Sequence, residues 1–302
     1  MFEKKIESTI LVISTLIFAF ILQMFSLHSS ASILIIGYLI VAGLVLLHYD
    51  LHIVHKHTNP FRAAHTEHFH LPFIEKWFMT IVKGVLNRIH HFYKKENVSS
   101  HMHFLIQPTF LYWSVCSILF FFINPWLSGG LVVAASLCFM LILASISMIY
   151  KKALIIEEKH FHLLSITKTL IVFFSFMASY GYYFFRLTTG YNAVVLTMAV
   201  TVSLLYQFAW KSGKLFKKEL VWPSIFWAGL FTAAICLILV NSFTNYYFAV
   251  VCLFASYYLC FGILKHYIKG DLTKKIALEY VISAIMLVAL IWVNTYFGQQ
   301  VL

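Results

Sequence analysis

Nine long apolar runs, separated by short polar segments, limit what this chain can fold into. They lie near residues 6–27, 32–49, 106–124, 129–149, 169–186, 191–210, 221–241, 246–264 and 276–296. About 20 helical residues cross a bilayer core of about 30 Å. Each run must be helical, because backbone groups cannot stay unpaired in lipid. The runs predict an all-α, polytopic integral membrane protein with about nine transmembrane helices.

The composition excludes a soluble domain of this length. Of the 302 residues, 61% are hydrophobic and 11% are charged, against roughly 45–50% and about 25% in soluble domains. No linker rich in Pro, Gly or Ser divides the sequence, so residues 1–302 are predicted to form a single transmembrane domain. The first run lacks a small-residue cleavage site, and we expect it to be a permanent span.

The basic residues predict the orientation. If the runs alternate sides, 21 of the 22 Lys and Arg residues fall in segments 4–5, 50–105, 151–168, 211–218 and 265–275, all on one side. Such an excess marks the cytosolic side. The sequence therefore predicts a cytosolic N-terminus and an outer C-terminus, in the cytoplasmic membrane of a bacterium. The basic residues are spread over five segments without a nucleic-acid-binding motif, so no nucleic acid partner is expected.

Residues 50–105 form a His-rich cytosolic or interfacial segment inserted between the second and third runs. Within it, residues 73–93 have helical periodicity, with Trp77 on the apolar side and Lys83 on the polar side. That pattern predicts an amphipathic helix lying in the headgroup layer. A tenth span is disfavoured because Glu75 and Arg88 would then lie in hydrocarbon.

Histidine is the main chemical feature: eleven of the 15 histidines fall between residues 48 and 103. If the second helix continues toward Pro60, His48, His52 and His55 lie at i, i+4 and i+7 and share one face, as ligands of one metal must. Asp50 could orient one of these imidazoles.

Three further groups follow on the predicted cytosolic side, and one of them contains a Glu-x-x-His step typical of carboxylate di-metal bundles. All four groups could converge in one layer near the membrane surface. The candidate metal ligands are His48, His52, His55, His65, His68, His90, His91, Glu157, His160 and His162.

A mixed histidine and carboxylate set suits Fe or Zn. The layout resembles that of the membrane di-iron desaturases and hydroxylases, which carry histidine boxes after an early span, a few dozen residues later and after a later pair of spans. His48 and His52 match the first HxxxH box, whereas HxxHxH at 65–70 and HxH at 160–162 depart from the later boxes. The resemblance implies oxygen activation at iron and hydroxylation or desaturation of a lipid tail.

Other interpretations of the histidines stay open. They could form an interfacial surface with no bound metal, or serve pH sensing or headgroup recognition. We expect His28, His57, His70 and His266 to be bystanders. The five cysteines all fall inside the predicted spans, without CxxC spacing, and are predicted to be packing residues.

Three functions follow from this pattern. The first is a metal-dependent enzyme acting on a lipid or other apolar substrate, by hydroxylation or desaturation with iron, or by hydrolysis or group transfer with zinc. The second is a permease or exporter, with a soluble ATPase as its partner. The third is a non-catalytic protein that binds metal or lipid. Glu279 is the one clear carboxylate inside a run, which disfavours ion-coupled transport.

Overall fold

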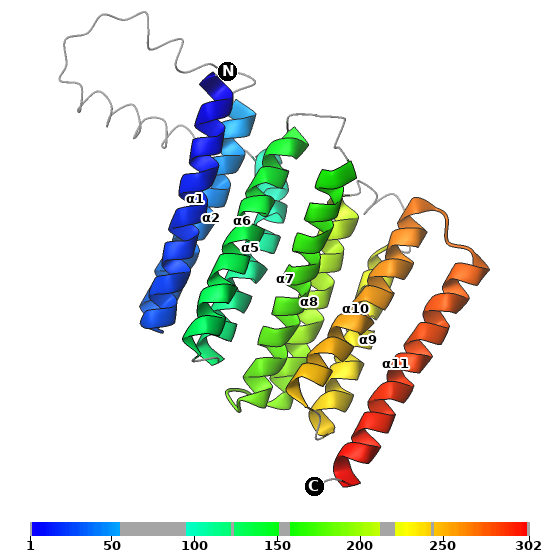
Figure 1. Ribbon diagram of the computed structural model, residues 1–302. Coiled ribbons are helices and arrows are strands. Elements are labelled where there is room, and N and C mark those ends of the chain that lie inside the picture. The colour runs from blue at the N-terminus through cyan, green and yellow to red at the C-terminus, as the bar shows by residue number, and fades with distance from the viewer. Residues whose placement is uncertain are drawn as a thin grey trace, which may run out of the picture.

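The computed structural model describes residues 2–54, 95–121, 124–150, 158–211, 221–242 and 245–300, and these form nine helices (Figure 1). The helices are α1 (Phe2–Leu27), α2 (Ala31–Val54), α5 (Lys95–Phe121), α6 (Pro125–Tyr150), α7 (Glu158–Phe184), α8 (Gly190–Lys211), α9 (Val221–Asn241), α10 (Tyr246–Lys269) and α11 (Lys274–Gln300). The predicted interfacial helix at 73–93 lies outside the described residues.

Each of the nine apolar runs corresponds to one helix, so the all-α prediction is confirmed for the described residues. Six helices, α1, α2, α6, α8, α9 and α10, are long and apolar enough to cross a membrane. The apolar part of α5, Leu105–Phe121, is shorter, and α7 is rich in Ser, Thr and Tyr. The chain is therefore a multi-pass membrane protein, while nine crossings and the cytosolic N-terminus stay predictions.

The helices are antiparallel to their neighbours in sequence and associate into two rings of four (Figure 1). In the first ring, α1 contacts α2, α2 contacts α5, α5 contacts α6, and α6 closes on α1. In the second ring, α7, α8, α9 and α10 close in the same way. The rings meet along α5 and α7, where Phe110, Phe173 and Met177 pack against both hydrophobic cores. Helix α11 packs on the outer side of α10.

Hydroxyl groups link helices across the junction between the rings. Ser114 Oγ of α5 donates to Ser175 Oγ of α7 at 3.1 Å, and the Ser117 and Tyr182 hydroxyls are 2.7 Å apart. Such polar contacts stabilise helix association in lipid. Contact between apolar faces contributes little free energy there, because lipid tails are as apolar as the side chains. Ser114, Ser117 and Ser175 are thus buried between helices and away from lipid.

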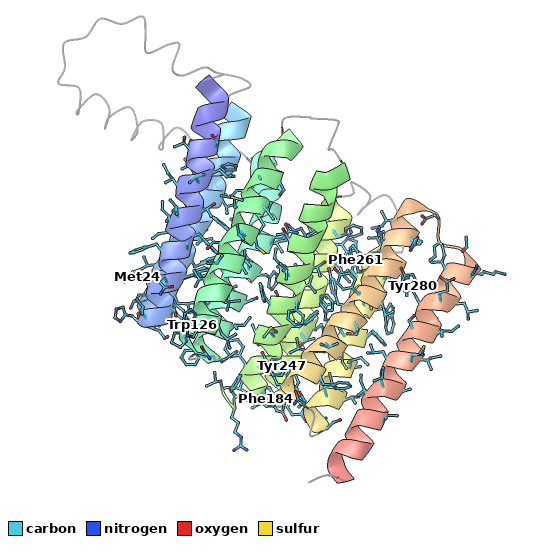
Figure 2. The ribbon with its side chains drawn as sticks, viewed as in Figure 1. Met24, Trp126, Phe184, Tyr247, Phe261 and Tyr280 are labelled. Carbon is cyan, nitrogen blue, oxygen red and sulfur yellow. The ribbon has the colours of Figure 1, made fainter. Side chains whose placement is uncertain are left out.

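The outer surface is suited to lipid. Large apolar side chains are exposed along the helices, among them Leu16, Phe20, Leu39, Val133, Val195 and Ile285. A water-soluble protein rarely exposes so much apolar surface. Trp126, Tyr191 and Tyr247 are exposed at the second residues of α6, α8 and α10, which all begin at the same end of the molecule (Figure 2). This row matches the aromatic belt of a membrane–water interface.

The cysteines pack inside the helices, as predicted. Cys116 and Cys138 are buried in the first core, Cys236 and Cys252 are buried in the second, and Cys260 is half-buried.

Candidate functional site

A cavity of about 190 Å³ lies where α5 of the first ring meets α7, α8 and α10 of the second. We call it the junction cavity. It lies toward the ends of α8 and α10, because Gln207 is four residues before the end of α8 and Lys265 is four residues before the end of α10. Alternation of the helices places this end opposite the exposed aromatic row. Its lining residues are Gln107, Lys168, Ile171, Val172, Leu204, Gln207, Phe208, Tyr257, Tyr258, Phe261 and Lys265.

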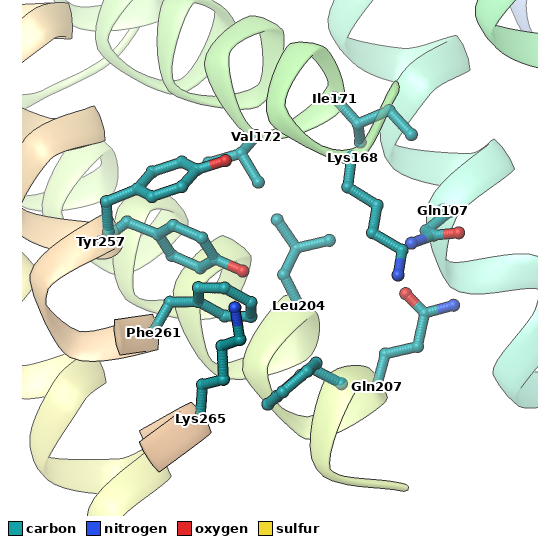
Figure 3. A pocket seen from close by; sticks show the side chains of 11 residues that line it. Gln107, Lys168, Ile171, Val172, Leu204, Gln207, Tyr257, Phe261 and Lys265 are labelled. Carbon is teal, nitrogen blue, oxygen red and sulfur yellow. The ribbon is translucent and has the colours of Figure 1, made fainter. Parts of the chain in front are cut away.

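The polar part of the junction cavity combines two lysines and two amides. Lys168 and the two glutamines reach in from three helices on one side, and Lys265 lies among aromatic residues on the other (Figure 3). Gln207 is 2% exposed and Gln107 is 9% exposed. Among the described lining residues there is no Asp or Glu, so the two ammonium groups lack a carboxylate partner within this lining.

The apolar part of the cavity is a fixed set of aromatic rings on α8 and α10. The rings of Phe208 and Phe261 meet edge-to-face with centroids 4.7 Å apart, and Tyr257 stacks on Phe261 with an interplanar angle of 12°. The Tyr258 hydroxyl is hydrogen-bonded to Thr169 Oγ1 of α7, which fixes its ring beside the cavity. The cavity therefore places cationic and amide groups directly beside an apolar aromatic wall.

The chemistry of this lining favours an anionic, partly apolar ligand. Ammonium and amide N–H groups donate hydrogen bonds to phosphate or carboxylate oxygens, and such bonds are strongest where water is scarce. Lys168 is exposed and Lys265 is half-buried, so both ammonium groups are accessible to such a ligand. With a volume of about 190 Å³, the cavity has room for an anion of the size of a lipid headgroup but is too small for a whole lipid.

The predicted histidine site is described only in part. Helix α2 continues through Val54, past the end of the apolar run 32–49, and sets His48 and His52 one turn apart. His48 is 2% exposed. His52, His160 and His162 lie on described helices, α2 and α7, but their side chains are not among those described.

The other predicted ligands, His55, His65, His68, His90, His91 and Glu157, lie outside the described residues. Within the described part of the chain, no three His, Cys, Asp or Glu side chains gather as metal ligands would. Among the predicted bystanders, His28 is exposed in the turn after α1, and Nδ1 of His266 is 2.9 Å from Asp271 Oδ1.

The sequence did not identify the junction cavity, because its polar residues adjoin or begin spans where topology explains them equally well. Lys168 directly precedes the predicted run 169–186, and Lys265 directly follows the run 246–264. The available indication was a pair of glutamines, Gln107 near the start of one run and Gln207 near the end of another, which places both on the predicted cytosolic side. Hydropathy alone does not place α5, α7, α8 and α10 around one point.

Comparison with known proteins gives no relative for this chain: no family model, no curated protein and no solved structure matches it. The function must therefore be argued from the site.

Proposed function

We propose that this multi-pass membrane protein binds an anionic amphiphile, with the acidic group of the ligand held in the junction cavity. The observation that carries the proposal is the convergence of Lys168 and Lys265 on one cavity whose described lining contains no carboxylate. We expect a phosphate or carboxylate in this cavity to accept hydrogen bonds from the two ammonium groups and from the Gln107 and Gln207 amides. The aromatic wall then contacts the apolar part of the ligand.

The test uses protein purified in a neutral detergent and titrated with short-chain, water-soluble dihexanoyl phosphatidate. We expect Lys168→Gln and Lys265→Gln each to weaken binding about tenfold or more, since a lost charge-assisted hydrogen bond is worth ~1.5–3 kcal/mol. The matched control is Lys274→Gln together with Lys275→Gln, because both lysines are exposed at the start of α11 and neither lines the cavity. Equal binding by all variants would refute a ligand in this cavity.

Metal-dependent chemistry on the bound amphiphile is a second candidate function. It is supported by the helical register of His48 and His52 on α2 and by the position of this end of α2 on the same side of the molecule as the junction cavity. Histidines spaced i and i+4 on one helix can be neighbouring ligands of one metal, and the further ligands would come from the other predicted groups. Iron would supply oxygen activation, and zinc would supply hydrolysis or group transfer.

Elemental analysis tests this second function on protein purified from cells grown with ample iron and zinc. We expect near-stoichiometric iron or zinc, lost in His52→Ala and in His160→Ala and retained in His28→Ala, whose histidine lies at the opposite end. Wild-type protein without metal above background would exclude the metal-dependent enzyme and leave the binding proposal intact.

Transport is distinguished from turnover by the fate of the ligand. A permease would move phosphatidate between the leaflets of liposomes in the presence of chelator, and this movement would depend on Lys168 and Lys265. An enzyme would change the ligand chemically, and a binding protein would do neither.

A further inference from the structure

A second hollow of about 620 Å³ lies between α10 and α11, on the outer side of α10 from the junction cavity. Its lining is mainly apolar along most of its length, with Ala255, Leu259, Leu287 and Leu290 facing it. We call it the α10/α11 groove. It borders the region where lipid surrounds the helices, because α11 stands at the edge of the molecule (Figure 1).

The groove and the junction cavity share part of their lining. Tyr258, Phe261 and Lys265 of α10 face both hollows. Lys265 and His266 stand at the polar end of the groove, where Tyr280 of α11 also lies, and the residues toward Leu290 are apolar. The groove therefore has one cationic end next to the anion-binding groups and one apolar end that extends along the helices.

The contact between α10 and α11 is close at the polar end of this groove. The Tyr280 ring lies so near Gly262 that even an alanine Cβ there would overlap the ring. Beyond this contact, most of α11 is exposed, including Ile285 and Met286. Helix α11 thus contacts α10 at Gly262, and its exposed Met286 lines the groove farther along.

Resting on the proposed function, we infer that the ligand is a bilayer lipid that enters laterally from the membrane, with its hydrocarbon chain in the α10/α11 groove and its anionic group at Lys265. The occupant follows from the wall that the two hollows share at Tyr258, Phe261 and Lys265, from the charge at one end of the groove and from the apolar lining of the rest. A free anion would use the junction cavity alone, whereas a lipid uses both.

The experiment compares three probes on the purified protein: inorganic phosphate, dihexanoyl phosphatidate and a long-chain phosphatidate supplied in nanodiscs of neutral phosphatidylcholine. Met286→Trp fills the groove, and Ile285→Trp is the matched control, since both side chains are 63% exposed and only Met286 lines the groove. We expect Met286→Trp to weaken long-chain binding about tenfold or more, equivalent to the loss of two buried CH₂ groups or more at ~0.8 kcal/mol each. We expect Met286→Trp to weaken the binding of dihexanoyl phosphatidate less than it weakens the binding of the long-chain lipid, because the short chains occupy less of the groove.

Distinct outcomes separate the two proposals. If Met286→Trp and Ile285→Trp bind the long-chain lipid equally, the groove is not the chain site, even when short-chain binding still depends on Lys168. If no probe depends on Lys168, the proposed function itself fails. If phosphate binds as tightly as both lipids, the site recognises a free anion, and the lipid inference is overturned.

Discussion

At the residue scale, Gly37 determines how closely α2 approaches α1 and α5. A Cβ at this position would overlap the Tyr112 hydroxyl and come 2.6 Å from Ile21 Cγ2. The Tyr112 hydroxyl donates to the Leu34 carbonyl of α2 at 2.9 Å, so the same close approach also brings a hydrogen bond. Small residues have this role in membrane helices because they let backbones come near one another.

We therefore expect Gly37→Ala to destabilise the first ring by ~1–3 kcal/mol, as overpacking does in a close-packed core. The control is Gly43→Ala in the same helix, where no atom lies within 4 Å of an added Cβ. There, alanine should leave stability unchanged or raise it by ~0.5–1 kcal/mol through helix propensity. Thermal unfolding in detergent measures both variants, and equal melting temperatures would contradict the packing argument.

At the scale of elements, α10 is fixed at both ends and separates the junction cavity from the α10/α11 groove. At its N-terminus, Asn245 Oδ1 accepts a hydrogen bond from the Tyr247 N–H at 3.0 Å. At its C-terminus, Gly270 adopts the left-handed conformation with φ 84°, and its N–H donates to the His266 carbonyl at 3.0 Å. These caps satisfy groups that a helix end leaves unpaired.

Replacement of Gly270 should destabilise the turn between α10 and α11, because other residues adopt the left-handed conformation only at a cost in free energy. We expect Gly270→Ala to lower stability by ~1–2 kcal/mol and Gly270→Asn to lower it less, since asparagine tolerates this conformation. Melting temperature gives the global effect, and hydrogen exchange at residues 266–273 gives the local one. Identical behaviour of the Ala and Asn variants would show that backbone conformation does not limit this turn.

At the scale of the whole molecule, nine antiparallel helices among the described residues place the two ends of the chain at opposite ends of the molecule (Figure 1). The aromatic row lies at one end, and Lys265 and the start of α11 lie at the other. If all nine helices cross the bilayer, the turn between α7 and α8 is outside the cell and the turn between α10 and α11 is inside.

Single cysteines test this orientation in intact bacterial cells. We expect a membrane-impermeant maleimide to label Leu187→Cys, in the exposed turn after α7, and to label Lys274→Cys only after lysis. Wild-type protein is the control, because four of its cysteines are buried and Cys260 is half-buried within α10. The opposite labelling pattern would reverse the predicted orientation.

The positions of the helices could be predicted from the sequence, whereas the packing of the helices around a site could not, for a physical reason. Helices form locally, and lipid leaves no other way to pair the backbone, so hydropathy located helices such as α9, Val221–Asn241, without any knowledge of its neighbours. The convergence of the four histidine groups is a prediction that rests largely on residues outside the described part of the chain.

By itself, the sequence determined a helical membrane protein and the apolar part of each described helix, whereas α5 and α7 begin well before their predicted runs, at Lys95 and Glu158. Only the tertiary structure decided that the helices close into two rings, and that Lys168 and Lys265, far apart in the chain, face one cavity. Apolar faces are nearly equivalent to one another in hydrocarbon, so hydropathy does not choose helix partners. Helix partners are instead determined by close contacts at residues such as Gly37 and by hydroxyl pairs such as Ser114 and Ser175. These contacts form only once the helices are together.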